Sequence, residues 1–508
     1  MAEDTVHWAD VVAKDVLKNR GNRHVIATGI TPSGPIHIGN MREVVTADAV
    51  RLALKDHGAD VRLHYIADSY DPLRKVYPFL SEDYASHVGK PISEIPDPDG
   101  CCANYAEHFL QPFLDAMEKL GIGTDVTRAD QMYKRGDYAD AILTALINED
   151  KIAQRLAEVT GRTMPQNWSP FNPLCEQCGR ITMTIVTGYH GKGVDYECQC
   201  GHQGTADISK GDGKLTWRVD WPARWKILGI TVEPFGKDHA VAGGSYDTGI
   251  RIAKEVYDYD PPYPIPFEHI FLKGHGKMSS SAGVVISVQE MLDVLPPEVL
   301  RYLIIRAKPE RHIDFDPGAP LLNLIDEYDR LNETDRSYEL STKVPFRHMQ
   351  IAREVSTKVP FRHMVTIVQI ARNFDRIVET LKRSGYEIDD VGAIKQRAKN
   401  AENWLNKFAP SVVKFKVRET LPNAAKELSP QQKRALNILA DEIGREWTAD
   451  ALHAEIYQIA GNVGVDPKYV FEAAYIALLG TPSGPRAGWF LTSLSPNFIR
   501  KRFKEAST

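Results

Sequence analysis

The sequence predicts an α/β protein with a doubly wound parallel sheet, followed by an all-helical C-terminal region. Apolar strand-like runs, such as residues 24–30 and 61–67, alternate with helical patterns, such as residues 45–55. This alternation is typical of a parallel sheet with helices on both faces. Between about residues 90 and 210, helical patterns give way to Cys-rich and Gly-rich hairpins, which indicates an insertion between two halves of one nucleotide-binding fold. Beyond about residue 330, helical periodicity dominates.

The expected elements follow from the hydrophobic periodicity in chain order. A helix over 8–19 precedes the first strand, and a later helix over 105–120 contains Pro112, where a bend is expected. A further strand-like run covers 268–272. In the C-terminal region helices are expected over 367–381, 392–405, 433–445, 449–459 and 467–479.

Length and composition place the chain among ordinary soluble globular proteins. Its 508 residues suffice for several domains, and 43% of them are apolar and 25% charged. No run approaches the roughly 18 consecutive apolar residues that a membrane span needs. Residues Met1–Thr5 lack the basic and then apolar pattern of a signal peptide. We expect a cytoplasmic protein that acts as a monomer.

Charge is unevenly distributed along the chain. The net charge is −5, but residues 331–508 carry 27 Lys and Arg against 20 Asp and Glu. Within residues 391–437 there are ten basic and three acidic residues. Such asymmetry favours a nucleic-acid partner for the C-terminal region. The alternative is a solvated helix face, which is the commoner explanation of any single charged run.

A strand, a turn and a helix start come together near residue 37. The strand-like run 24–30 leads through Pro32–Pro35 to His37–Asn40, where a helical pattern begins. Unpaired backbone N–H groups and the helix dipole attract an anion to such a place. The sequence therefore predicts a phosphate site here, although an ordinary loop histidine would give the same short pattern.

A second motif, Lys277–Ser281, follows the strand-like run 268–272 on a Gly-rich and Ser-rich loop. Such a loop can close over a nucleotide, and Lys277 would bring a mobile ammonium to it. Either motif alone occurs by chance in many proteins. Their conjunction, with each motif following a strand, favours a shared nucleotide site.

The six cysteines form two clusters with spacings typical of metal ligands rather than of disulfides. Cys175 and Cys178 are followed along the chain by a second group that contains Cys198, Cys200 and His202. Closely spaced thiolates on tight turns converge on one tetrahedral zinc ion. Five donors compete for four places, so either Cys200 or His202 is spare.

The other cluster predicts a second zinc site with less regular spacing. Asp97, Cys101 and Cys102 precede His108, which lies on the expected helix over 105–120. Adjacent cysteines can ligate one ion at a junction between a loop and a helix. The alternative is a pair of ordinary thiols.

Beyond these motifs, the strings Asp68–Lys75, Asp220–Trp225 and Gly236–His239 make the chain resemble the class I lysyl-tRNA synthetases over nearly its whole length. The resemblance implies a Rossmann-type catalytic domain over 1–315 with the zinc-binding insertion at about 90–210. It further implies a connecting segment over 316–345 that contacts the tRNA stem, and an α-helical anticodon-binding domain over 346–508.

The resemblance also implies an activity: ATP-dependent attachment of lysine to tRNA(Lys) through a lysyl-adenylate, with Mg²⁺ on the phosphates. His37, Asn40 and Lys277 would be the catalytic residues. The ATP site would comprise Pro32, Ser33, Gly34, His37, Gly39, Asn40, Lys277, Met278, Ser279, Ser280 and Ser281. The lysine site would comprise Gly29, Thr31, Asp220, Trp221, Asp238, His239 and Tyr246.

Two departures from the general class I pattern bear on the chemistry. Asn40 replaces the usual second histidine, and Ser280 stands where many relatives carry a second lysine. Asn40 can still donate to a phosphate oxygen, whereas the missing lysine leaves more charge stabilisation to Lys277.

Two other functions fit the same motifs. One is another class I synthetase, such as a glutamyl enzyme, or another nucleotidyltransferase; the other is a non-catalytic tRNA-binding paralogue. Retention of His37, Asn40 and Lys277 argues against the paralogue. A tandem duplication, in which Ser341–Met349 recurs as Ser356–Met364, predicts no function.

Overall fold

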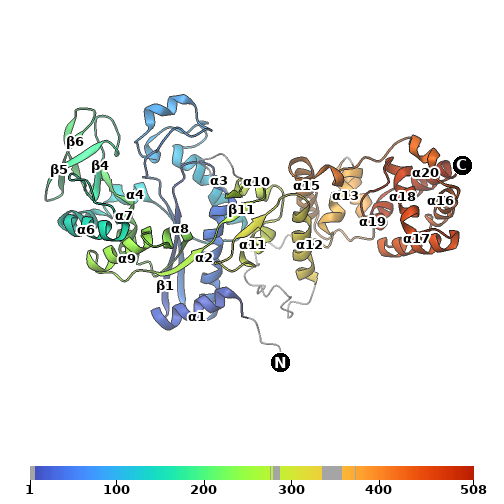
Figure 1. Cartoon of the computed structure of the whole chain (residues 1–508), viewed down its shortest axis with the longest axis horizontal. Coiled ribbons are helices and arrows are strands. Elements are labelled where there is room, and N and C mark those ends of the chain that lie inside the picture. The colour runs from blue at the N-terminus through green and yellow to red at the C-terminus, as the bar shows by residue number, and fades with distance from the viewer. Residues whose placement is uncertain (1–5, 275, 278–285, 334–356, 372) are drawn as a thin grey trace. The chain divides into compact units, whose positions relative to one another are not determined.

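The protein is described by a computed structural model that covers residues 6–274, 276–277, 286–333, 357–371 and 373–508 (Figure 1). The chain forms two compact units. The first comprises residues 1–291, 300–315 and 336–352, and the second comprises residues 292–299, 316–335 and 353–508.

The first unit is built around a five-stranded sheet. Its strands are β1 (Arg23–Ile30), β2 (Asp60–Ala67), β3 (Asp125–Arg128), β9 (Val232–Gly236) and β10 (Tyr263–Phe267). They lie in the order β10-β9-β1-β2-β3, and every pair is parallel. In chain order, β2 and β3 lie on one side of β1, and β9 and β10 then lie on its other side. The predicted doubly wound parallel sheet is confirmed, and its winding reverses between β1 and β9.

Helices flank this sheet in the first unit. They include α1 (Trp8–Arg20), α2 (Ile38–Asp56), α3 (Tyr105–Lys119), α7 (Trp217–Leu228), α8 (Lys237–Ala240) and α9 (Ser245–Glu255). α2 packs against β1, β2 and β9 with a face that includes the fully buried Met41 and Val45. The helices expected over 8–19 and 105–120 are confirmed, and α3 contains Pro112.

The segment between β2 and α7 includes residues 90–210, which were expected as an insertion, but within that range β3 belongs to the main sheet. It contains 3₁₀ turns η1 (Glu82–His87) and η2 (Ile92–Glu94), and helices α4 (Ala129–Arg135), α5 (Ala139–Ile147) and α6 (Glu149–Thr160). Its antiparallel strands are β4 (Phe171–Pro173), β5 (Thr184–His190), β6 (Gly193–Cys198), β7 (Gln203–Asp207) and β8 (Gly213–Leu215). The tight turn between β5 and β6 uses Gly191 at φ 56°, a conformation that favours glycine.

A small second sheet completes the first unit. Its strands are β11 (Ile270–Leu272), β12 (Gly276–Lys277) and β13 (Ile313–Phe315), and α10 (Val288–Leu292) and α11 (Pro297–Ile305) lie between β12 and β13 in the chain. β11 pairs antiparallel with β12 and parallel with β13. The strand expected over 268–272 is confirmed as β11.

The described part of the second unit is helical, as expected. Its helices are α12 (Ala319–Glu333), α13 (Phe361–Ile370), α14 (Phe374–Arg383), α15 (Val391–Lys407), α16 (Pro430–Glu442), α17 (Ala449–Val463), α18 (Pro467–Leu479), α19 (Ala487–Ser493) and α20 (Pro496–Ser507). Leu436, Leu439, Ile456, Phe490 and Phe503 lie in its main hydrophobic core. α18 matches its predicted bounds.

One helix prediction is wrong. The periodicity over 367–381 predicts a single helix, but α13 ends at Ile370 and α14 begins at Phe374. The side chain of Asn373 accepts a hydrogen bond from the backbone N–H of Arg376 at 3.0 Å, which caps α14 and starts it afresh.

Of the duplicated segment, Ser341–Met349 lies outside the described residues, whereas Thr357–Met364 leads into α13. The described helices include none that is long and apolar enough to cross a membrane.

Candidate active site

A cavity of about 450 Å³ lies in the first unit at the carboxyl ends of β1 and β9. Ile30 and Gly236, the last residues of these strands, both line it. Ligands of doubly wound sheets bind where the winding reverses, because the loops that follow the two strands diverge there. Residues predicted for the site that line the cavity are Thr31, Ser33, Gly34, His37, Gly39, Asn40, Asp238 and His239.

Two reciprocal hydrogen bonds fix the start of α2 beside this cavity. Nδ1 of His37 accepts from the backbone N–H of Gly39 at 3.1 Å, and Oδ1 of Asn40 accepts from the backbone N–H of His37 at 3.3 Å. The accepting Nδ1 puts the proton of the neutral ring on Nε2, and the accepting Oδ1 leaves the amide N–H groups of Asn40 as donors. The helix start therefore offers donors to an anion from both motif residues.

The turn between β1 and α2 is held by the segment that follows β2. A Cβ atom at Gly34 would lie 2.7 Å from Cζ of Phe79, so only glycine allows this approach. The hydroxyl of Tyr105 donates to the carbonyl of Ser33 at 2.7 Å. Pro32 belongs to the same turn but does not line the cavity.

Glu43 lines the cavity one helical turn after Asn40, and sequence reasoning missed it. Its Oε1 accepts a hydrogen bond from the backbone N–H of Gly29 at 2.9 Å. Burial, reinforced by the carboxylates of Glu233 and Asp68, raises the pKa of Glu43 to about 8. The sequence feature that could have indicated Glu43 is its position three residues after Asn40, on the helix face that carries the motif.

A second missed carboxylate, Glu233, lies on β9 among aromatic rings. It accepts from Nε1 of Trp221 at 3.0 Å and from Nε1 of Trp225 at 2.5 Å, and burial raises its pKa to about 7. The predicted residues Trp221 and Tyr246 pack in this aromatic cluster and do not themselves line the cavity. The ring of His239, which does line it, lies 5.5 Å from that of Trp221.

Asp220 lies apart from the cavity in a buried charge network. Its carboxylate accepts from Nζ of Lys214 at 2.9 Å, Nη2 of Arg224 at 2.8 Å and the hydroxyl of Tyr133 at 2.6 Å. Burial opposes its ionisation, but the two adjacent cations lower the pKa of Asp220 to about 2.

Asp71 links this network to the cavity. It pairs with Lys214 at 2.9 Å and accepts from the hydroxyl of Thr31 at 2.6 Å. Thr31, a residue of the cavity wall, is thereby linked through Asp71 and Lys214 to Asp220, which was predicted to contact lysine.

The two ends of the second motif's loop lie beside the cavity. Lys277 pairs with Phe271 of β11, and the neighbouring Ile270 lines the cavity. Beyond the loop, the backbone N–H of Ile38 donates to the carbonyl of Ile286 at 3.3 Å. Met278, Ser279, Ser280 and Ser281 lie outside the described residues, as do the side-chain contacts of Lys277.

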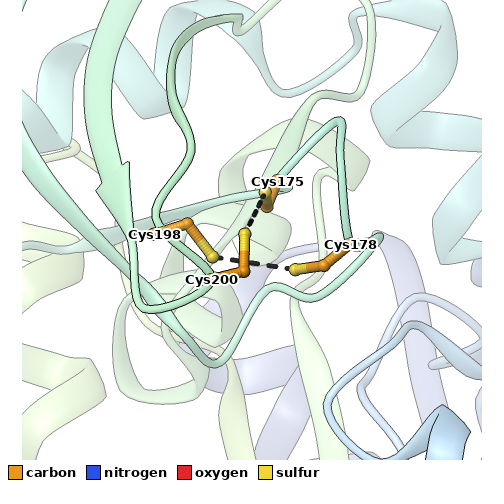
Figure 2. Close-up of side chains that lie close together, drawn as sticks. All are labelled: Cys175, Cys178, Cys198 and Cys200. Atoms are coloured by element: carbon orange, nitrogen blue, oxygen red, sulfur yellow. Dashed lines mark hydrogen bonds between the residues drawn. The ribbon is translucent and has the colours of Figure 1, made fainter.

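Four cysteines converge in the insertion, as Figure 2 shows. Sγ of Cys175 lies 3.7 Å from that of Cys200, and Sγ of Cys178 lies 3.7 Å from that of Cys198. A tetrahedron of thiolates at about 2.3 Å from zinc has edges of about 3.8 Å, so the spacing fits the ion. The four ligand atoms all lie within 4.8 Å of one another. His202 lies outside this group of four, and its Nε2 contacts Oε1 of Glu176 at 2.8 Å.

The second predicted cluster also comes together. Oδ1 of Asp97 lies 2.8 Å from Nδ1 of His108, and Sγ of Cys101 lies 3.3 Å from that of Cys102 and 3.4 Å from Nδ1 of His108. The four ligand atoms lie within 4.8 Å of one another. This mixed set of oxygen, sulfur and nitrogen donors suits zinc.

Comparison with known proteins gives a consistent result. The profile of the family "tRNA synthetases class I (K)" matches residues 6–355, and that of the family "Anticodon binding domain" matches residues 364–507. The chain is 55% identical to the lysine–tRNA ligase of Methanosarcina barkeri, covering 99% of this chain and 98% of that one. It is 50% identical to the lysine–tRNA ligase of Archaeoglobus fulgidus, covering 99% and 100%. Among solved structures, a glutamate tRNA ligase from Elizabethkingia meningosepticum aligns over 95% of this chain and 99% of its own, at 14% identity and a TM-score of 0.47.

Proposed function

The chain belongs to the class I (K) tRNA synthetases, and from this premise we propose how its cavity carries out the attachment of lysine to tRNA. The protein is an aminoacyl-tRNA ligase that joins lysine to tRNA with the consumption of ATP. The observation that supports our assignment of the site is the cavity between β1 and β9, which brings the start of α2 together with the partly buried carboxylate of Glu43.

We place the phosphates of ATP at the start of α2. His37 and Asn40 would donate to phosphate oxygens, beside the turn that contains Gly34. Mg²⁺, which the family implies, would find its ligands mainly on the phosphates and would shield charge on the leaving pyrophosphate. Lys277 would stabilise the charge that grows on that group in the transition state.

Lysine would bind with its ε-ammonium at Glu43. A buried ammonium requires a carboxylate or an aromatic face, and the cavity offers Glu43 with His239 and the rings behind it. Glu233 lies in the aromatic cluster and adds negative potential. Asp238 and Thr31 also line the cavity, and we retain both as lysine contacts.

For Asp220 we propose a positioning role in place of substrate contact. Three donors already satisfy its carboxylate, so it would act through Lys214 and Asp71 on the hydroxyl of Thr31. Gly29, Trp221 and Tyr246 would likewise act from behind the cavity, through Glu43 and His239.

The reaction proceeds in two displacements. A carboxylate oxygen of lysine attacks the α-phosphorus of ATP, the bond to the bridging oxygen breaks, and pyrophosphate leaves with that bond's electrons. A ribose hydroxyl at the 3′ end of tRNA then attacks the lysyl carbonyl, and AMP leaves. No covalent bond to the protein is needed, so positioning and charge stabilisation supply the catalysis.

The helical unit would grip the anticodon arm of tRNA. In the segment 411–418 side chains alternate: Phe415 and Val417 pack against the helical core, whereas Lys414, Lys416 and Arg418 are exposed. We call these three cations the basic ridge. They would bind phosphates, a sequence-independent contribution, while exposed aromatics elsewhere would stack on loop bases.

Structural zinc would occupy the two clusters. Each supplies four donors and leaves no open position, so the ion would hold hairpins and the start of α3 in place rather than take part in the reaction. We also retain the domain boundaries near residues 315 and 345 and the cytoplasm as the site of action.

Pyrophosphate exchange tests this function. With ATP, full-length tRNA and each of the twenty amino acids in turn, lysine alone should drive exchange. Exchange driven by glutamate and not by lysine would contradict the proposal.

A further inference from the structure

We propose that Arg74 binds a phosphate group in the active-site cavity and is a substrate-contacting residue beyond the two sequence motifs. The inference rests on the proposed function, since it takes the cavity at the start of α2 as the place where ATP and the 3′ end of tRNA meet. It concerns a side chain on the segment that follows β2, which neither motif includes.

Arg74 lies where a phosphate group would bind. It lines the same cavity as His37 and Asn40. The other ionisable groups of this lining are three histidines, two carboxylates and the phenol of Tyr77, and one of the carboxylates, Asp238, lies 3.2 Å from Nε2 of His269. Among the described side chains that line the cavity, Arg74 is the only permanent cation. A polyphosphate needs such charge.

Hydrogen bonds and buried neighbours hold the backbone that carries Arg74. Its neighbour Leu73 is fully buried, and its N–H donates to the carbonyl of Lys90 at 2.9 Å. In return, the N–H of Gly89 donates to the carbonyl of Leu73 at 2.8 Å. On the other side Tyr77 is buried and stacks on Phe79, the ring that covers Gly34. The side chain of Arg74 therefore extends from a backbone that is fixed beside the turn between β1 and α2.

The side chain of Arg74 also has the chemistry that a phosphate site needs. In the part of the chain that the structure describes, Arg74 forms no ion pair with a carboxylate, in contrast to the buried Arg224, which pairs with both Asp68 and Asp220. A guanidinium offers five N–H donors in a planar fork that matches two oxygens of a phosphate. The adjacent Lys75 lies over the ring of Tyr77 at 5.7 Å and does not line the cavity.

Two sources could supply the phosphate: the triphosphate of ATP, or the terminal phosphodiester of tRNA. In the first case Arg74 would neutralise charge beside His37. In the second it would hold the 3′ nucleotide near the activated carboxyl. The same guanidinium chemistry serves both, and binding measurements separate them.

The experiment uses the whole chain with Arg74→Ala and Arg74→Lys. Arg23→Ala is the matched control, because Arg23 is highly exposed at the opposite end of β1. Calorimetric titration with ATP and with AMP gives the first comparison. Filter binding of full-length tRNA and of tRNA lacking its terminal adenosine nucleotide gives the second. Equal thermal unfolding of all variants would show that the fold is kept.

If ATP is the source, Arg74→Ala should weaken ATP binding by roughly 10- to 100-fold, the range for a charge-assisted hydrogen-bonded pair, and Arg74→Lys should restore part of it. Unchanged AMP binding would place the contact on the outer phosphates, and an equal loss for AMP would place it on the α-phosphate. If tRNA is the source, Arg74→Ala should weaken binding of full-length tRNA alone.

Unchanged binding of ATP and of both tRNA forms in Arg74→Ala would overturn the inference. The ATP titration does not require lysine-dependent activity. It therefore tests the role of Arg74 even if the chain proved to activate another amino acid, and failure of the inference would leave the proposed function standing.

Discussion

The backbone N–H of Gly29 donates to Oε1 of Glu43 at 2.9 Å and joins the carboxyl end of β1 to the first turns of α2. This bond orients the partly buried carboxylate of Glu43 near the turn between β1 and α2. The same helix thereby presents donors for an anion at its start and an acceptor for a cation one turn later. Activation of lysine needs both kinds of group, because the ε-ammonium of lysine is positive and the phosphates of ATP are negative.

Glu43→Gln should raise the KM for lysine by roughly 10²–10³-fold, because it removes one partner of a buried ion pair. The KM for ATP should change little. Steady-state aminoacylation with each substrate varied in turn measures the two values. Glu82→Gln, an exposed carboxylate on η1, is the control and should behave as the parent. A normal lysine KM in Glu43→Gln would place the ammonium elsewhere.

Lysine affinity should rise with pH. Burial raises the pKa of Glu43 to about 8, so below that pH the free cavity holds a neutral acid that must lose its proton to bind an ammonium. Affinity should increase by up to about tenfold per pH unit between pH 6 and 8 and level off above 8. Calorimetric titration with lysine measures this, and Glu43→Gln should flatten the curve. A pH-independent affinity in the parent would contradict the assignment.

The same raised pKa predicts how stability depends on pH. Glu43 binds its proton more tightly folded than unfolded, so its contribution is fully present below the ordinary glutamate pKa and is lost as pH rises through about 8. Without lysine, the free energy of unfolding of the parent should therefore fall relative to that of Glu43→Gln between pH 5 and 8. Denaturant titrations of both proteins at several pH values provide the comparison, and parallel curves would refute it.

Lys277→Ala should lower kcat by roughly 10²–10³-fold with a modest change in the KM for ATP, the pattern of a lost transition-state contact. Single-turnover formation of lysyl-adenylate measures the step directly. Lys273→Ala removes an exposed cation from the same hairpin and should have little effect. Near-normal turnover in Lys277→Ala would remove it from the catalytic residues.

Elemental analysis should find two zinc ions per chain. Cys178→Ser and Cys102→Ser should each remove one ion, since each breaks a different set of four donors. His202→Ala should remove none, because its ring contacts Glu176. A loss of zinc in His202→Ala would reverse the choice between Cys200 and His202, and a parent protein without zinc would eliminate both sites.

Neutralising the basic ridge with Lys414→Gln, Lys416→Gln and Arg418→Gln should weaken tRNA binding and flatten its dependence on salt. Each lost phosphate contact should reduce the logarithmic salt slope by about 0.7–0.9. Discrimination among anticodons should remain. Because Nε of Arg418 also donates to the carbonyl of Leu479, the double variant at Lys414 and Lys416 checks that the effect is electrostatic. If the triple variant bound tRNA as the parent does at both low and high salt, the basic ridge would not be a tRNA contact.

The local parts of this site could be predicted from the sequence, because strand, turn and helix start are neighbours in the chain. Hydrophobic runs indicated β1 and β2, and the glycine-containing turn marked the start of α2. The single helix expected over 367–381 was wrong because one N-cap, Asn373, outweighed continuous periodicity.

The remaining parts depended on contacts between distant segments. Asp220 stands beside tryptophans in the sequence and was predicted to contact lysine. Its partner Lys214 lies on β8 of the insertion, and no local pattern could reveal that pairing. Glu43 was missed because an acid in the first turns of a helix is usually solvated. Only the packing of β1 against α2 shows that its carboxylate contacts Gly29. The convergence of the four cysteines 175, 178, 198 and 200 likewise depends on contacts between distant segments.

We infer that this cavity attaches lysine to tRNA. The most direct test incubates the purified chain with ATP, full-length tRNA and radiolabelled lysine, and counts acid-precipitable label beside a parallel reaction with glutamate. We expect lysine charging by the parent, a severe loss in both Lys277→Ala and Glu43→Gln, and no charging with glutamate. Charging with glutamate, or full lysine charging by Glu43→Gln at subsaturating lysine, would contradict it.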